Sequence, residues 1–446
     1  MDSGSLVAFR VAFGALTLIA VVRHLANGWV EQFFVVPRVF FPYPGLEWIV
    51  PLPAAGMYAL YAGLALCALG ILLGAWTRSS ALLFCVGFTY VHLIDRTNYL
   101  NHYYLVTLIS GLLAIVPAGA AGSIDAWRDV SRRSPMVPAW AVWLLRFQLG
   151  VVYAFGAVAK LNPDWLLRAE PLRIWLGASV DLPLLGPWLE QAWVAYAFSY
   201  AGLLFDAAIV PLLLWRRSRA LAYGGVLAFH VLTAALFPIG MFPWLMIALT
   251  PIFFAPDWPR RALRWLVPSA AAPASESARA AMSVVAWPRS RRARGWLVAG
   301  LGMYAAVQIA VPLRHLAYGG DLYWSESGFR WAWQIMVMEK FGRALFTVVD
   351  PATKAAQLVR PFDELTPLQA RMMATQPDMI MSYVRHLQQR FGDAVQIYAD
   401  VTVTLNGRPA VPLVDPAVDL AALPDAAPLS AWLMPHPDAQ RQFAAR

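Results

Sequence analysis

Apolar runs close to the length of a membrane span recur along most of the first 315 positions, and no other feature limits the fold as strongly. About 20 mainly apolar residues are needed to cross the hydrocarbon core of a bilayer. Only 14% of the residues are charged, whereas a soluble domain carries about 25%. The opening run LVAFRVAFGALTLIAVV is too long, and too poor in a small-residue cleavage site, for a signal peptide. The chain is therefore predicted to be a polytopic membrane protein.

The pattern predicts a transmembrane domain followed by a smaller domain of mixed structure. Nine spans are expected at about residues 5–22, 56–75, 80–94, 102–118, 140–159, 192–214, 220–236, 242–255 and 296–313. The predicted fold class is an α-helical polytopic membrane protein with about nine transmembrane helices and a small C-terminal α+β domain on the outer face. Residues 1–314 are assigned to the membrane domain, 256–295 to a cytoplasmic linker within it, and 315–446 to the extracytoplasmic domain.

The excess of positive charge indicates the orientation. Arginines cluster in three connections between predicted spans, as Arg128, Arg132 and Arg133, then Arg216, Arg217 and Arg219, and then Arg260, Arg261, Arg264, Arg289, Arg291, Arg292 and Arg294. All three connections fall on one side if the nine spans are correct, and such clusters mark the cytoplasmic side. The net charge of +9 then reflects membrane topology, and we expect no nucleic-acid partner. The N-terminus is predicted to be cytoplasmic and the C-terminal domain extracytoplasmic.

Lys160 ends the fifth predicted span in a chain that otherwise relies on arginine. Only Lys160, Lys340 and Lys354 are lysines among the 35 cationic residues. A lysine at a helix end most often extends its ammonium into the lipid headgroups. A buried lysine can instead be a neutral amine, and hence a base, near neutral pH, which arginine cannot. The small residues of GAVAK suit helix packing, so the sequence favours a functional amine while both interpretations stay open.

A polar segment, DRTNYLNHYYL at 95–105, separates the third and fourth predicted spans. It is either a corner whose polar groups satisfy one another or a site that lines a cavity at the membrane surface. His102 begins the fourth span and Lys160 ends the fifth, so both are predicted at one membrane depth. His92 and His230 are interpreted as packing histidines. The sequence has no zinc-ligand spacing and no phosphate-binding loop, and we expect no metal.

An aromatic loop, EQFFVVPRVFFPYPGLEW at 31–48, follows the first span. It is interpreted as an interfacial belt, or else as an entrance for a flat lipophilic ring from the bilayer. Cys67 and Cys85 both lie in apolar segments and are expected to pack as small hydrophobic residues rather than form a disulfide.

The region after residue 314 has patterns of a small soluble domain. A hairpin is predicted around Asp350–Thr353, a helix over 365–392 with Thr366 as N-cap, and an alternating strand over 395–405. That strand is followed by Asn406–Gly407, the strongest short signal for a hairpin turn.

Five segments in order resemble those of the vitamin K-dependent γ-glutamyl carboxylase family, including its bacterial members. They are YVHLIDRTNYLNHYYL (90–105), VVYAFGAVAKLNPDW (151–165), LFPIGMFPW with PIFFAPDWPR (236–260), PLRHLAYGG with WSESGFRWAWQIMVMEK (312–340), and IYADVTVTLNGR with LVDPAVDL (397–420). The resemblance implies that a neutral amine at Lys160 deprotonates vitamin K hydroquinone, either phylloquinol or menaquinol. Reaction with O2 then gives an epoxide-bearing alkoxide that removes a γ-proton from glutamate, and the carbanion captures CO2.

The resemblance also implies the other site residues. His102 is expected to act in the glutamate chemistry, with Asn101 beside it. Quinol or substrate binding is expected for Tyr99, where the family has tryptophan, and for His315, Trp333, Met336 and Lys340. The implied partners are membrane lipids, the quinol and a glutamate-containing peptide or exported protein, and the implied location is a bacterial inner membrane.

Two expected differences from the animal members of the family leave alternative functions open. Met338 and Lys340 replace a histidine and an arginine of the animal enzymes, and we expect the large region that helps animal members grip a propeptide to be missing. The chain is therefore interpreted as a carboxylase, with two alternatives: a quinol oxygenase that does not carboxylate, or a non-catalytic membrane scaffold or lipid-binding protein.

Overall fold

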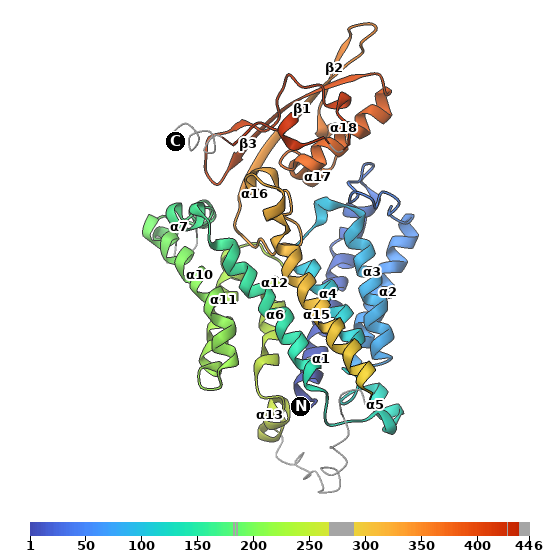
Figure 1. The fold of residues 1–446 in the computed structure, drawn as a ribbon, viewed down its shortest axis with the longest axis vertical. Helices are drawn as coiled ribbons and strands as arrows, with labels where there is room; N and C mark the ends of the chain where they lie inside the picture. Colours follow the sequence, from blue (N-terminus) through green and yellow to red (C-terminus); the bar gives the residue numbers. More distant parts are fainter. Residues whose placement is uncertain (182, 184–185, 267–289, 426, 437–446) are drawn as a thin grey trace.

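A bundle of long helices carries a small sheet domain at one end (Figure 1). This arrangement is seen in a computed structural model, which describes residues 1–436 apart from 182, 184–185, 267–289 and 426. Within the described residues, seven helices are long and apolar enough to cross a membrane: α1 (Gly4–Ala26), α2 (Ala54–Leu73), α3 (Thr77–Ile94), α6 (Ala139–Lys160), α10 (Ala192–Leu214), α11 (Arg219–Leu236) and α15 (Arg291–Leu313). The chain is thus a helical membrane protein, as predicted.

Two of the nine predicted spans are shorter than expected. They correspond to α4 (Asn101–Ile115) and to α12 (Phe242–Leu249), which continues as the 3-10 turn η4 (Thr250–Phe253). Both pack inside the bundle, where Leu105, Ile109, Leu245 and Leu249 are almost fully buried. Their lengths are therefore set by packing against neighbouring helices and not by the thickness of the bilayer. The prediction of nine spans is corrected to seven helices of spanning length among the described residues.

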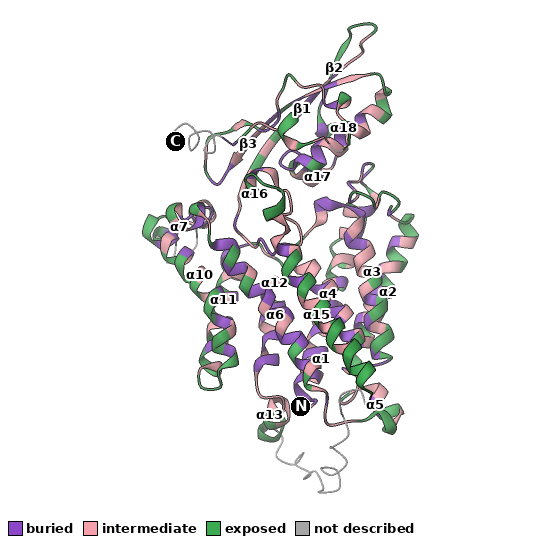
Figure 2. Cartoon of the chain, viewed as in Figure 1, coloured by how far each residue is buried: buried purple, intermediate pink, exposed green. Residues whose placement is uncertain are grey.

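Helix α6 is the central helix of the bundle. It is the most buried of the seven long helices, whereas α15 is the most exposed. Figure 2 shows the exposed residues along the outer sides of α2, α10 and α15. Apolar side chains on these outer surfaces are expected to face lipid, because burying them against another helix has no hydrophobic driving force within a bilayer.

The described arginines of the three connections lie on or beside α5 (Ile124–Arg128), in the turn between α10 and α11, on α13 (Trp258–Leu266) and at the start of α15, all at the end of the bundle opposite the sheet domain (Figure 1). The N-terminal amine of Met1 donates to the carbonyl oxygen of Val137 at 2.8 Å, and Arg260 pairs with Asp2 at 3.1 Å. Arg260 belongs to α13, a helix within the segment predicted to be a linker. The predicted linker, 256–295, thus contains α13 and the first residues of α15, and its middle, 267–289, lies outside the described residues; its role as a cytoplasmic linker stays a prediction.

The sheet domain contains four antiparallel strands in the order β2-β1-β3-β4. Their bounds are β1 (Lys340–Val349), β2 (Ala356–Val359), β3 (Gln396–Leu405) and β4 (Val411–Pro412). Both predicted hairpins are confirmed. In the second hairpin, which follows β3, Asn406 and Gly407 have φ values of +47° and +72°. Positive φ at both central residues is the backbone conformation that a tight two-residue hairpin turn requires.

Helices α17 (Pro367–Met373) and α18 (Pro377–Phe391) pack on the sheet. Thr366 caps α17 and forms a capping box with Gln369, which confirms the predicted N-cap. The single helix predicted over 365–392 is wrong, because it breaks at Gln376–Pro377. Proline disfavours helical backbone at the preceding residue, and Gln376 is extended, with φ −116° and ψ 111°.

Short elements complete the described chain. They are η1 (Glu31–Val35), η2 (Arg96–Asn98), α5 (Ile124–Arg128), η3 (Val130–Arg132), α7 (Pro163–Arg168), α8 (Leu172–Gly177), α9 (Gly186–Leu189), η7 (Arg314–Ala317), α16 (Leu322–Ser325), η8 (Pro361–Asp363), η9 (Leu420–Ala422) and η10 (Leu429–Ala431).

Polar contacts join the sheet domain to the bundle. Gln369 donates to the carbonyl oxygen of Val39 at 2.7 Å and to Asp95 at 2.8 Å. Asp164, on α7, accepts two hydrogen bonds from Arg408 and one from Asn406, at 2.6–2.8 Å. Burial raises the pKa of Asp164, but these hydrogen bonds outweigh it and the pKa is lowered. The hairpin turn after β3 is thus fixed beside the end of α6.

Candidate active site in two adjoining cavities

Lys160 points into the bundle and not toward the headgroups. The residue is only 5% exposed, and its Nζ donates to Asp206 Oδ2 at 2.7 Å and to the carbonyl oxygen of Gly156 at 3.2 Å. The ring of Trp165 lies 5.2 Å from Nζ. A Cβ at Gly156 would lie 3.0 Å from Asp206 Oδ2, so a larger residue there would have to displace this carboxyl group by a few tenths of an ångström. The sequence left two interpretations of Lys160 open. Its burial excludes the one in which the ammonium extends into the lipid headgroups.

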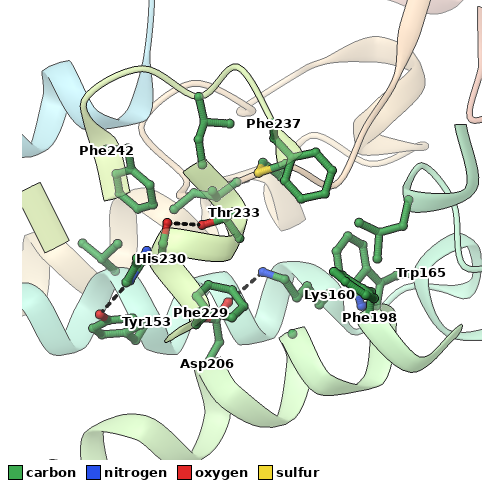
Figure 3. Close-up of a pocket in the computed structure, with 16 residues that line it drawn as sticks. Tyr153, Lys160, Trp165, Phe198, Asp206, Phe229, His230, Thr233, Phe237 and Phe242 are labelled. Atoms are coloured by element: carbon green, nitrogen blue, oxygen red, sulfur yellow. Dashed lines mark hydrogen bonds and ion pairs between the residues drawn. The ribbon is translucent and has the colours of Figure 1, made fainter. Parts of the chain in front are cut away.

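The first cavity, which we call the lysine cavity, has a volume of about 80 Å³ and is lined mainly by apolar and aromatic side chains (Figure 3). Its polar side chains come from α6, α10 and α11. Besides Lys160 and Asp206, they include His230, whose Nε2 lies 3.1 Å from the hydroxyl of Tyr153. Nδ1 of His230 is buried and has no hydrogen-bond partner among the described residues.

The second cavity, which we call the histidine cavity, is much larger, at about 540 Å³. Residues of α1, α3 and α4 line it, together with Leu368 and Met372 of the sheet domain. His24, His92 and His102 all face it, among aromatic side chains such as Trp29 and Phe88. An apolar cavity of this size with a few convergent polar groups is the usual form of a small-molecule site.

Tyr99 and Asn101 connect the histidine cavity to the segment 331–336. The hydroxyl of Tyr99 donates to Asn101 Oδ1 at 3.0 Å and accepts from the backbone N–H of Trp331 at 2.6 Å. Asn101 Nδ2 donates to the carbonyl oxygen of Gln334 at 3.2 Å. The polar segment at 95–105 therefore holds the backbone of a distant segment in place, in addition to lining a cavity.

The two cavities share one wall. Four residues line both: Ile239, Phe242, Ile335 and Met336. Lys160 and His102, 58 positions apart in the sequence, thus face opposite sides of the same few side chains. The backbone of this region is strained, with φ values of +61°, +54° and +54° at Trp331, Trp333 and Met336. Such strain in residues other than glycine clusters at functional sites.

Met336 offers a test of that strain. Met336→Gly and Met336→Ala both remove the side chain, but only glycine adopts a left-handed φ without a steric cost. We expect the glycine variant to be more stable than the alanine variant by about 1 kcal/mol, as measured by unfolding in mixed micelles. Equal stabilities, or a more stable alanine variant, would show that the backbone relaxes and that the wall is not strained.

The other predicted site residues lie outside both cavities in the part of the chain that the structure describes. Trp333 is completely buried against Tyr104, with 4.9 Å between ring centroids. His315 Nδ1 lies 2.8 Å from the carbonyl oxygen of Pro312. Lys340 donates to the carbonyl oxygen of Trp324 and to Glu326, at 2.8 and 3.1 Å. Burial lowers the pKa of Lys340, and the carboxylate of Glu326 opposes this effect.

Asp206 was not predicted from the sequence, and His230 was interpreted as a packing histidine. A signal for Asp206 was present, because it is the only acidic residue in the predicted span 192–214. An ionisable residue inside a span marks a functional site by default. No group of three or more His, Cys, Asp or Glu residues that could hold a metal ion occurs among the described residues.

Comparison with protein-family models gives two matches that together cover most of the chain. The model of the HTTM domain matches residues 1–258. The model described as vitamin K-dependent gamma-carboxylase, lumenal domain, matches residues 293–439. No solved structure matches the chain.

Proposed function

Because the chain belongs to the vitamin K-dependent gamma-carboxylase family, we propose that it is a quinol-dependent γ-glutamyl carboxylase with Lys160 as its initial base. The observation that carries this proposal is a lysine amine buried in an apolar cavity, beside a second cavity large enough for a lipophilic substrate. A base must reach its proton within hydrogen-bond distance and be uncharged at the working pH. Lysine can meet the second requirement and arginine cannot, because the guanidinium stays protonated in proteins.

The histidine cavity fits reduced vitamin K, the co-substrate that the family implies. Its 540 Å³ falls within the range of about 300–1,000 Å³ for small-molecule sites. The lysine cavity, at about 80 Å³, is smaller than the cavity of about 150 Å³ that holds benzene in an engineered protein. We therefore place the quinol in the histidine cavity, with its ring at the shared wall. Phylloquinol and menaquinol both satisfy this description.

Contact between the quinol ring and Lys160 then requires side chains of the shared wall to move. Met336 is the unbranched, flexible side chain among the four wall residues, and methionine adapts to irregular contacts better than isoleucine or phenylalanine. When bound, the quinol supplies the reaction with O2 and the strong base that no side chain can provide. The protein supplies the first deprotonation, excludes water and holds the glutamate near the same wall.

His102 and Asn101 are proposed to act on the glutamate side, where CO2 is captured. Both line the cavity that Leu368 and Met372 of the sheet domain also line, so a glutamate-containing peptide or exported protein would approach from the end that carries the sheet domain. The proposed topology has the arginine-rich end in the cytoplasm and the sheet domain outside the inner membrane.

The first experiment combines purified protein with chemically reduced vitamin K, O2, labelled bicarbonate and a short glutamyl peptide. Formation of epoxide together with labelled peptide is the expected result. Epoxide without label across a panel of glutamyl peptides would indicate a quinol oxygenase that does not carboxylate. Neither product, with phylloquinol or with menaquinol, would contradict the proposed function.

His102→Ala is expected to separate the two activities. Carboxylation should fall by about 100-fold or more, the range for loss of a proton-transferring side chain, while epoxide formation continues. His386→Gln is the matched control, because His386 lies in the sheet domain and contacts Glu364 at 3.0 Å. Equal loss of both activities in His102→Ala would place His102 in quinol binding instead.

A further inference from the structure

The amine of Lys160 and the carboxyl group of Asp206 form a pair that is almost completely buried. Their side chains are 7% and 9% exposed, and Nζ and Oδ2 are 2.7 Å apart. The other titratable side chains that line the lysine cavity are Tyr153 on α6 and His230 on α11. Figure 3 shows these two bonded to each other, away from the Lys160–Asp206 contact. The proton shared by the pair therefore lies either on the amine of Lys160 or on the carboxyl group of Asp206.

The hydrogen bonds around Nζ match a neutral amine. An ammonium has three N–H groups, whereas a neutral amine has two N–H groups and one lone pair. Nζ has two acceptors, Gly156 O and Asp206 Oδ2, and its remaining direction faces the apolar cavity and the ring of Trp165. A third N–H would point at the ring of Trp165, whose centroid lies 5.2 Å from Nζ, within the range of a cation–π contact. The two hydrogen bonds therefore fit a neutral amine without excluding an ammonium, and the apolar surroundings decide between the two forms.

Electrostatics favour the same assignment. Removing two opposite charges from water costs more than their mutual attraction returns, unless further hydrogen bonds satisfy both groups. Here the surroundings are mostly apolar, and the contacts are those already named. Moving one proton within the pair removes both charges at once. Arginine at this position would not permit the transfer, because its guanidinium stays protonated in proteins.

We propose that the proton shared by this pair resides on Asp206, so that Asp206 is a neutral carboxylic acid that positions a neutral Lys160 amine; the proposal rests on the proposed function of Lys160. One N–H bond of the lysine breaks and one O–H bond forms on the carboxyl group, which leaves Lys160–NH2 and Asp206–COOH. The proton moves along the contact between Nζ and Oδ2, and rotation of the carboxyl group then turns the O–H away from Nζ. The remaining carboxyl oxygen accepts from Nζ, which keeps both of its hydrogen bonds and directs its lone pair into the cavity. Asp206 is a positioning residue, because the amine and not the carboxyl group meets the quinol.

Infrared difference spectroscopy tests this assignment without turnover. The spectrum of the wild-type protein minus that of Asp206→Asn, at neutral pH, is expected to contain the C=O stretching band of a protonated carboxyl group, shifted in 2H2O. Asp400→Asn is the control, because Asp400 is exposed on β3 and should give no such band. Absence of the band in the Asp206 difference spectrum would overturn the proposal.

Kinetics give a second, independent test. The amide introduced by Asp206→Asn resembles a neutral aspartic acid in shape and in its acceptor oxygen, so this variant should retain the wild-type kcat for epoxidation within about 10-fold. Asp206→Leu, which has no acceptor, should lose at least 100-fold in kcat with little change in KM. A folded Asp206→Asn protein that loses 100-fold or more would overturn the proposal, since a negative charge would then be required. An inactive wild type would refute the proposed function and leave the infrared test intact.

Discussion

Lys160→Ala is expected to abolish quinol epoxidation and CO2 fixation together. The two activities share the first deprotonation, so loss of the base removes both, by a factor of at least about 10²–10⁴. Epoxide is measured chromatographically and CO2 fixation by label in the glutamyl peptide. The variant must be shown to be folded, because it leaves Asp206 without its partner at 2.7 Å. Retention of either activity would remove Lys160 as the base.

Two further lysine variants make this result specific. Lys160→Arg should fail as completely as Lys160→Ala, because arginine keeps a positive charge but provides no neutral amine. Lys354→Ala should behave as wild type, since Lys354 is exposed in the turn between β1 and β2. Appreciable activity in Lys160→Arg would show that the site needs a cation and not a base.

Asp164→Ala is expected to loosen the sheet domain from the bundle. Asp164 accepts hydrogen bonds from Arg408 and Asn406, and its removal leaves both of these donors without that acceptor. Loss of one partner from a buried ion pair costs about 3–5 kcal/mol. We expect a loss of stability of that order, faster proteolysis between the domains, and a fall in both activities, because the sheet domain begins directly after the wall residue Met336.

Arg408→Ala provides the matched comparison. Its effect should be similar, and the double variant Asp164→Ala/Arg408→Ala should lose much less than the sum of the two single changes, as for any directly coupled pair. Because the folded pKa of Asp164 is lowered, its stabilisation is present at neutral pH and is lost as the pH falls through that lowered pKa. Strict additivity would show that this contact does not hold the two domains together.

Much of the fold could be predicted because it is set locally. Each long span is visible as an apolar run, and the Asn406–Gly407 turn and the Thr366 cap depend on residues only a few positions apart. The prediction failed where tertiary packing overrides local pattern. Helices α4 and α12 are apolar yet short, because they are enclosed by the bundle and need not match the bilayer.

The candidate site could be predicted only in part. Lys160 was identified because lysine is rare in this chain, and His102 because it lies in a polar break between spans. Asp206 was missed although it is a lone acid in an apolar run. Trp333, His315 and Lys340 were assigned by resemblance, and in the described structure they line neither cavity; their roles in binding stay predictions.

The sequence by itself determined that this chain is a helical membrane protein with a small sheet domain after its last span. The length of an apolar run and the alternation of apolar and polar residues are local patterns, which can be read from neighbouring positions. Only the tertiary structure decided which groups meet: the pairing of Lys160 with Asp206, and the wall that separates Lys160 from His102. The Lys160–Asp206 contact joins residues 46 positions apart, and the shared wall lies between residues 58 positions apart; both arrangements depend on how whole helices pack. No local pattern encodes that packing, because the same apolar surface can pack in many ways until all neighbouring helices are in place.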